Sequence, residues 1–171
     1  MLLSASSHAQ ALWIAPSEVR GTTCPIFRST FSLPDTPLTG KVRVTGLGHF
    51  ELHLNGRRVG ESLIHQPWSQ YNKTIYWQEF DVTRLLLKGE NAWGVMLGNS
   101  FWSVGKANDT MRYVKTDAMP DFSAGHPHLL RLEARIRTAD GREVTLASDS
   151  AWKWIDGPLT FSHIYAGEDF D

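Results

Sequence analysis

The chain has 171 residues, enough for one domain with a sizeable core, and its composition is that of an ordinary globular protein. A formal net charge of -1 and the lack of any apolar run near ~20 residues argue against nucleic acid and membranes as partners. A single cysteine, Cys24, excludes an internal disulfide and a cysteine-rich zinc site. The seven tryptophans supply either core volume or flat faces for a ligand.

The first residues are small and polar, and we expect residues 1–12 to be a flexible leader or the remnant of a signal peptide. Ala9-Gln10-Ala11 has the form of a signal cleavage site, although the apolar stretch before it is short and no Lys or Arg precedes it. A signal remnant would indicate a periplasmic or secreted protein, and the compartment stays open. Residues 13–171 are expected to form a single domain.

Alternation of apolar and polar residues dominates the first half of the chain and predicts half-buried β-strands. Asn55-Gly56 predicts a type I′ turn, because both residues tolerate a positive φ angle. Asp81 and Gly89 are expected to begin and end one short helical turn between strands. The predicted strands in this half are residues 27–33, 41–45, 50–54, 57–59 and 75–80.

In the second half, residues 91–98 are apolar on both faces, which predicts a central strand covered on both sides. Residues 99–127 interrupt the alternation of apolar and polar residues and are expected to form a loop. So long a loop in a compact domain is usually functional or disordered. Further strands are predicted at residues 130–137, 144–146, 152–155 and 161–164. The fold class predicted is all-β, an antiparallel β-sandwich or jelly roll with one short helical turn.

No catalytic motif is visible. Glycoside hydrolysis needs two carboxyl groups roughly 5–10 Å apart, and no Asp or Glu stands in a pattern that argues for a raised pKa. Asp140, for example, is a turn residue. His49, Glu51 and His53 point to one face of a predicted strand, but neighbours ~7 Å apart suit a solvated strand face better than a single metal ion.

Two segments hold the ingredients of a sugar site, in which a ring stacks on the apolar face of a pyranose and amides or charges bind its rim. The candidate carbohydrate-binding residues are Trp68, Asn99, Trp102, Asn108 and Asp109. The last two and Asn99 also carry oxygen atoms suited to calcium. The competing interpretation is that the rings close the sandwich or pack against another domain.

Residues 48–60 resemble the strand-turn-strand signature of the N-terminal domain of bacterial α-L-rhamnosidases. The resemblance runs from about residue 13 to residue 171, with one departure at Ser100, where the family often has glycine. The further pieces that stand in the family's order are Pro67-Trp68-Ser69-Gln70-Tyr71, Phe80-Asp81-Val82-Thr83 with Leu86, Gly89-Glu90-Asn91, Leu97-Gly98, Asp149-x-x-Trp152-Lys153, Gly157-Pro158 and Ile164-Tyr165-x-Gly167-Glu168-x-Phe170-Asp171.

The resemblance implies a galactose-binding-domain-like jelly roll ahead of a helical barrel that carries the catalytic acids, so no catalytic residue is assigned to this chain. It implies two partners, the catalytic domain of the same polypeptide and carbohydrate such as L-rhamnosyl groups, with calcium as a candidate cofactor. We therefore expect a non-catalytic module of an α-L-rhamnosidase-type glycoside hydrolase. The alternatives are a stand-alone carbohydrate-binding module, the sugar-binding domain of a β-galactosidase- or β-glucuronidase-type enzyme, and a structural sandwich with every tryptophan buried.

Overall fold

The structure, a computed structural model, describes residues 10–18, 23–103, 122, 128–164 and 167–171. Its elements are β1 (Pro25–Leu33), β2 (Pro37–Leu47), β3 (His49–Leu54), β4 (Arg57–Arg58), β5 (Gln78–Asp81), η1 (Thr83–Leu85), β6 (Gly89–Gly98), η2 (Ser100–Trp102), β7 (Leu129–Thr138), β8 (Glu143–Ala147), β9 (Lys153–Asp156), β10 (Leu159–His163) and β11 (Gly167–Phe170). Both η elements are short 3₁₀ turns.

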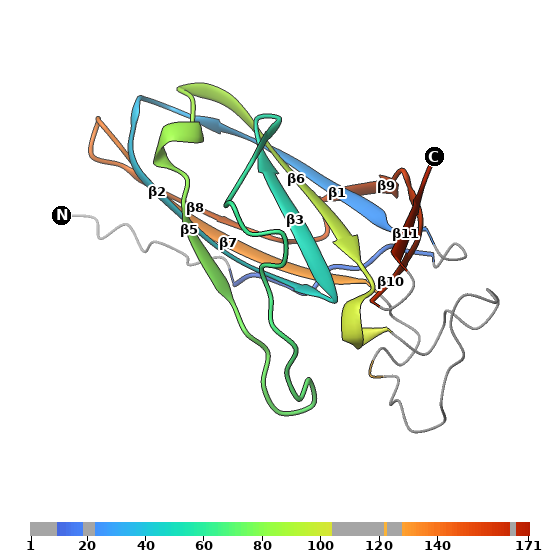
Figure 1. Ribbon diagram of the computed structural model, residues 1–171. Coiled ribbons are helices and arrows are strands. Elements are labelled where there is room, and N and C mark those ends of the chain that lie inside the picture. Colours follow the sequence, from blue (N-terminus) through green and yellow to red (C-terminus); the bar gives the residue numbers. More distant parts are fainter. Residues whose placement is uncertain (1–9, 19–22, 104–121, 123–127, 165–166) are drawn as a thin grey trace.

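Two antiparallel sheets form the sandwich (Figure 1). One sheet has the strand order β4-β3-β6-β1-β9, the other has the order β5-β2-β7-β8, and β10 and β11 form a separate hairpin at one end. The predicted all-β antiparallel sandwich is confirmed. No helix among the described residues is long and apolar enough to cross a membrane.

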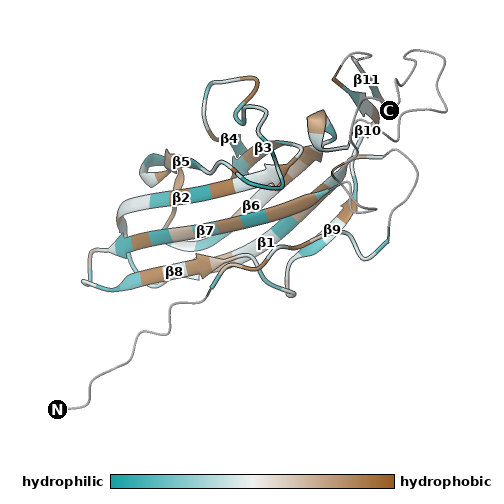
Figure 2. Cartoon of the chain, turned by 90° about the horizontal axis from the view of Figure 1, so that it is seen from below, coloured by the Kyte–Doolittle hydropathy of each residue, from teal (hydrophilic) through white to brown (hydrophobic). Residues whose placement is uncertain are grey.

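The core lies between the two sheets and follows from the alternation in the sequence, visible as alternating brown and teal along β2 and β7 (Figure 2). Because successive side chains of a strand point to opposite faces, one set of each strand is buried and the other faces outward. The fully buried residues include Phe27, Val42, Val44, Leu52, Leu54, Trp93, Val95, Leu97, Leu130, Leu132 and Ile136.

The prediction that residues 91–98 are covered on both faces is wrong for one face. β6 is the central strand of its sheet, and Trp93, Val95 and Leu97 are buried against the other sheet. Ala92 and Met96, on the opposite face, are only half-buried, because no second layer formed by the described residues covers the whole of that face. This outer face of β6 forms part of the groove described below.

The turns were largely predictable, since they depend on local chemistry. Asn55 and Gly56 have φ angles of 55° and 76°, as a type I′ turn requires. Asp81 Oδ1 accepts a hydrogen bond of 2.9 Å from the Thr83 N–H at the start of η1. Gly89 does not end that helical turn, which stops at Leu85, and begins β6 instead with a φ of 84°.

The strand predicted at residues 75–80 begins only at Gln78. The guanidinium groups of Arg43 and Arg131 lie over the Trp77 ring, with 5.1 and 5.3 Å from Cζ to the ring centroid. The chain therefore passes over the outer face of the four-stranded sheet before it joins the sheet edge. The second 3₁₀ turn, η2, and the strand β11 were not predicted.

The beginning of the described chain packs on the sandwich. Ala11 is buried, and the Leu12 N–H donates to the Ser148 carbonyl at 2.8 Å. The Ser148 hydroxyl donates back to the Leu12 carbonyl at 2.6 Å. Ile14 forms a β-bridge to Leu130 of β7. Residues on both sides of position 13 are thus held by the sandwich. Of the leader predicted at residues 1–12, residues 1–9 lie outside the described residues, whereas Ala11 and Leu12 pack on the domain.

Candidate functional site

Five rings gather where the loop between β4 and β5 meets η2. Four of them, which we call the aromatic cluster, are Trp68, Tyr71, Phe101 and Trp102, and the fifth, Phe122, meets Tyr71 at 5.5 Å. The Trp68 and Phe101 ring centroids are 5.5 Å apart at an interplanar angle of 35°. Tyr71 meets Trp102 edge to face at 5.4 Å. Such contacts are favourable for quadrupolar rings and fix the arrangement of the cluster.

The loop that carries Trp68 and Tyr71 is held by polar groups. Gln66 is 3% exposed, and its amide donates to Thr45 Oγ1 at 3.0 Å while its Oε1 accepts from the Gly46 N–H at 3.1 Å. The Ser69 hydroxyl donates to the Thr74 carbonyl at 2.7 Å and closes the loop on itself. Loop residues that are bonded to β2 in this way keep their side chains in place without a regular strand.

The other half of the cluster follows the end of β6. Asn99 donates from Nδ2 to the Ser162 carbonyl of β10 at 2.8 Å. Ser100 has a φ of 49°, and its Oγ lies 2.9 Å from His49 Nε2. Burial raises the pKa of Tyr71, against a hydrogen bond with Ser100 that lowers it. The cluster is therefore tied to β3, β6 and β10 together.

The structure brings three of the five candidate sugar-binding residues to one place. The Trp68 side chain is exposed, at 66% of its surface, beside Phe101, and Trp102 is half-buried against Tyr71. Asn99 precedes η2, and its Nδ2 donates to the Ser162 carbonyl. Asn108 and Asp109 lie outside the described residues, so their part in a site stays a prediction.

The exposure of Trp68 is not what a purely structural sandwich with every tryptophan buried predicts. Trp13 is also 37% exposed, whereas Trp93 is 1% exposed and belongs to the core. The seven tryptophans therefore have different roles, and only Trp68 combines high exposure with a place in a ring cluster.

Beside the cluster lies a groove that the sequence did not reveal, which we call the β3–β6 groove. It encloses about 540 Å³ over the outer face of β3 and β6, and the loop after β4 and the β10–β11 hairpin form its walls. Its lining comprises His49, Phe50, Glu51, Arg58, Leu63, Ile64, Met96, Leu97, Gly98, Ser100, Leu159, Ser162, His163, Ile164, Gly167 and Glu168. These residues are far apart in sequence, so no local pattern could unite them.

The polar groups of this groove are arranged in pairs. Glu51 Oε2 lies 3.2 Å from Arg58 Nε, and the Ser162 hydroxyl donates to Glu168 Oε1 at 3.4 Å. Burial lowers the pKa of both His49 and His163, which favours their neutral imidazoles near pH 7. The groove thus combines apolar surface with one ion pair, Glu51–Arg58, and with the Glu168 carboxylate, which accepts from a hydroxyl.

The stripe of His49, Glu51 and His53 on β3, for which the sequence favoured a solvated strand face over a metal ion, is engaged in protein contacts. Glu51 Oε1 lies 3.5 Å from His53 Nε2, while His49 is bonded to Ser100. No group of three or more His, Cys, Asp or Glu side chains within the described ranges could hold a metal ion. For calcium, Asn99 offers one side-chain oxygen where the ion takes six to eight, so the calcium prediction depends on Asn108 and Asp109.

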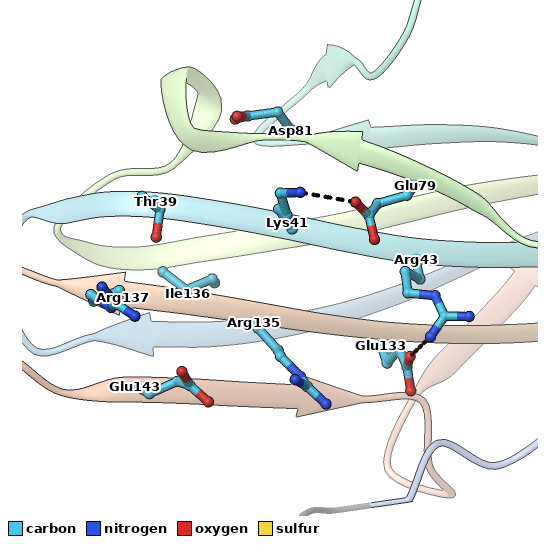
Figure 3. Close-up of a pocket in the computed structure, with 10 residues that line it drawn as sticks. All are labelled: Thr39, Lys41, Arg43, Glu79, Asp81, Glu133, Arg135, Ile136, Arg137 and Glu143. Atoms are coloured by element: carbon cyan, nitrogen blue, oxygen red, sulfur yellow. Dashed lines mark hydrogen bonds and ion pairs between the residues drawn. The ribbon is translucent and has the colours of Figure 1, made fainter.

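A second hollow of about 520 Å³ lies on the outer face of the four-stranded sheet (Figure 3). Lys41 pairs with Glu79 at 3.0 Å, and Arg43 pairs with Glu133 at 3.0 Å. Hydrogen bonds from the Thr83 side chain and main chain lower the pKa of Asp81 at its margin. Ion pairs and a lowered carboxyl pKa are typical of a solvated charged face and do not provide a general acid.

Comparison with known proteins identifies the family. The α-L-rhamnosidase N-terminal domain family matches residues 36–171. An α-L-rhamnosidase of Formosa agariphila is 33% identical over 158 residues, which are 91% of this chain and 16% of that protein. The chain therefore spans about one-sixth of the length of that curated relative.

Solved structures agree in fold. The native α-L-rhamnosidase of Aspergillus terreus superposes with a TM-score of 0.79 at 30% identity, over 95% of this chain and 18% of the other. The Streptomyces avermitilis α-L-rhamnosidase, solved in complex with L-rhamnose, gives a TM-score of 0.75 at 25% identity, over 88% and 14%. The ordered motifs, the sandwich and the family match over most of the chain agree, and this chain belongs to the α-L-rhamnosidase N-terminal domain family.

Proposed function

We propose that the chain is a non-catalytic module of an α-L-rhamnosidase-type glycoside hydrolase that packs on the catalytic domain of the same polypeptide. The observation that carries the proposal is one of proportion: 91% of this chain corresponds to only 16% of a curated α-L-rhamnosidase. The remaining five-sixths of such an enzyme is large enough to hold the catalytic machinery.

The carboxyl groups support this division of labour. Hydrogen bonds from Lys88 and Thr36 lower the pKa of Asp35, and those from Thr83 and Thr138 lower the pKa values of Asp81 and Asp140. A glycosidase needs one carboxyl group whose pKa is raised so that it stays protonated and can act as general acid. The pKa values of these three carboxyl groups are shifted in the opposite direction, downward.

The test uses two proteins and a chromogenic aryl α-L-rhamnoside. The isolated chain is expected to show no hydrolysis above buffer. The Formosa agariphila α-L-rhamnosidase is expected to lose thermal stability when its matching domain is deleted, and to regain it when this chain is inserted in its place. Saturable hydrolysis by the isolated chain would contradict the proposal, as would an inserted chain that restores no stability.

A second candidate function, carbohydrate binding by the aromatic cluster, is favoured by one observation. Trp68 exposes 66% of its surface while its ring lies against Phe101 of η2, the turn that Asn99 precedes. An exposed ring with an amide in the adjoining turn suits a pyranose. Calorimetric titration of the chain with L-rhamnose, with calcium and then with chelator, tests this candidate.

Saturable heat that Trp68→Ala abolishes would support the candidate, and loss on chelation would place an ion in the site. Trp13→Ala is the matched control, since Trp13 is also exposed but takes no part in the cluster. Binding that survives Trp68→Ala, or no binding at tens of millimolar sugar, would exclude this site.

A further inference from the structure

Two adjacent aliphatic side chains stand out on the surface beside the β3–β6 groove. Leu63 is 89% exposed and Ile64 is 62% exposed, and the next residue, His65, is only 8% exposed. A single exposed aliphatic residue is ordinary, but removing such a side chain from water is favourable. A pair left in water is therefore a surface for which burial against another group is favourable.

The main chain on the N-terminal side of this pair is fixed. Arg58 Nη2 donates to the Ser62 carbonyl at 2.6 Å, and the same guanidinium group is held by Glu51 at 3.2 Å. The anchor therefore begins on β3 and β4 and ends directly before Leu63.

The main chain on the C-terminal side is fixed by burial. The His65 ring stacks on Phe50 with a centroid distance of 5.4 Å and meets Phe80 edge to face at 5.2 Å. Gln66 follows with its two hydrogen bonds to β2. Leu63 and Ile64 are thus held between two anchors that do not involve their own side chains. A surface ordered in advance loses little conformational entropy when it binds.

The pair continues into the groove. Leu63 and Ile64 line one wall, and Leu159, Ile164 and neighbouring residues of the β10–β11 hairpin line the other. Phe170 of β11, paired in register with Leu159, is 75% exposed. This surface therefore combines exposed apolar side chains with the Glu51–Arg58 ion pair, a mixture that is typical of protein–protein interfaces.

We infer that the β3–β6 groove, with Leu63 and Ile64 in its wall, is the surface by which this module docks on the catalytic part of an α-L-rhamnosidase polypeptide. This inference rests on the proposed function. The choice of occupant follows from the position of β11. The match to the N-terminal domain family reaches residue 171, directly after β11, and in the relatives most of the polypeptide lies outside the matched region.

The C-terminal end lies beside β10 and β11 in Figure 1, at the same end of the sandwich as the groove. In a relative, the polypeptide that follows the matched domain therefore leaves it next to this surface. Because the next domain is tethered there, its effective concentration is high, and a modest apolar groove is sufficient for stable docking.

The experiment measures amide hydrogen exchange in the free chain and in the Formosa agariphila enzyme that carries this chain as its matching domain. Exchange at residues 61–65 and 159–163 is expected to slow by at least about tenfold in the chimaera. The double substitution Leu63→Ser, Ile64→Ser should remove this protection without changing the melting temperature of the free chain.

Leu38→Ser, Leu87→Ser is the matched control, because these leucines are 55% and 56% exposed but lie near the β1–β2 turn and η1, at the other end of the sandwich. The control should leave protection at residues 61–65 intact. A chimaera in which both parts melt cooperatively but residues 61–65 exchange as fast as in the free chain overturns the docking surface. Protection that survives the Leu63 and Ile64 substitutions overturns it too.

These outcomes are separate from the failure of the proposed function. A chimaera that is stabilised and active but unprotected at residues 61–65 keeps the module assignment and rejects only this surface. A chain that hydrolyses the aryl rhamnoside alone rejects the module assignment itself.

Discussion

The side chains of Asn55 and Asn91 meet at the base of the β3–β4 turn, where Nδ2 of Asn55 donates to Oδ1 of Asn91 at 2.9 Å. Asn55 also donates to the Leu85 carbonyl and accepts from the Ala92 N–H, each at 2.9 Å. The pair therefore joins the turn, η1 and the start of β6. Asn-Gly and Gly-x-Asn are two of the pieces by which the chain resembles its family, and their amides form one bonded unit.

Asn91→Ala should lower the free energy of unfolding by about 2–3 kcal/mol, because it removes several bonds at once. Asn91 is 3% exposed, donates to the Leu87 and Gly89 carbonyls at 2.8 Å and accepts from the Leu87 N–H at 2.9 Å. Urea unfolding measures the change. Asn72→Ala, at an exposed position, is the control, and equal midpoints for the two variants would contradict a structural role for the pair.

Gly48→Ala should destabilise the protein and disturb the aromatic cluster. A Cβ at this position would collide with the Asn99 carbonyl and lie 2.7 Å from Ser100 Cβ, so η2 would have to move. Gly94→Ala is the matched control, since its nearest atom would be His53 Cβ at an ordinary 3.9 Å.

Thermal unfolding and tryptophan fluorescence together measure the effect of Gly48→Ala. The fluorescence of Gly94→Ala should match that of the unsubstituted chain, and its melting temperature should stay the same or rise slightly. A Gly48→Ala protein with the stability and spectrum of the unsubstituted chain would show that the close approach of Gly48 to Asn99 is not required.

Cys24 should be inert in the folded protein. Its side chain is fully buried, and burial, aided by the charge of Glu168 and opposed by a hydrogen bond with Ser162, raises the pKa of its thiol to about 12. The thiolate is the reactive form, so alkylation at pH 8 should be negligible until the chain unfolds. Mass spectrometry after iodoacetamide treatment, with and without denaturant, measures this, and rapid labelling of the native chain would refute it.

Stability should fall as the pH drops below about 6.5. Burial lowers the pKa of His49, His65 and His163 below the ordinary 6.5, and for His65 the charge of Arg58 adds to the effect. As the pH falls, these histidines therefore bind protons more readily in the unfolded chain than in the folded chain. The free energy of unfolding decreases through this range as a result.

The lowered carboxyl pKa values act in a different window, since the stability linked to Asp35, Asp81 and Asp140 is lost only as the pH falls below their ordinary 3.8. Urea unfolding at pH values from 7.5 to 5 isolates the histidines. His65→Phe, which keeps a ring against Phe50, should reduce the slope of the free energy of unfolding against pH. An unchanged slope would show that His65 does not contribute to the pH dependence.

Much of the fold and the family were predictable from the sequence, because they depend on neighbours along the chain. The alternation at residues 130–137 predicted β7, since a strand with one buried face needs apolar residues at every second position. The Asn55-Gly56 turn was predictable because few residues adopt positive φ angles. The family resemblance likewise came from short motifs in a fixed order.

Only the tertiary structure determined which side chains are buried and which form exposed surfaces. The sequence placed two apolar faces on β6, but only the packing of the second sheet determined which face is buried and which forms the floor of the groove. Leu63 and Ile64 are apolar but exposed, whereas the polar Gln66 is buried because β2 supplies partners for its amide. Burial depends on which distant segments meet, and the identities of neighbouring residues alone do not determine it.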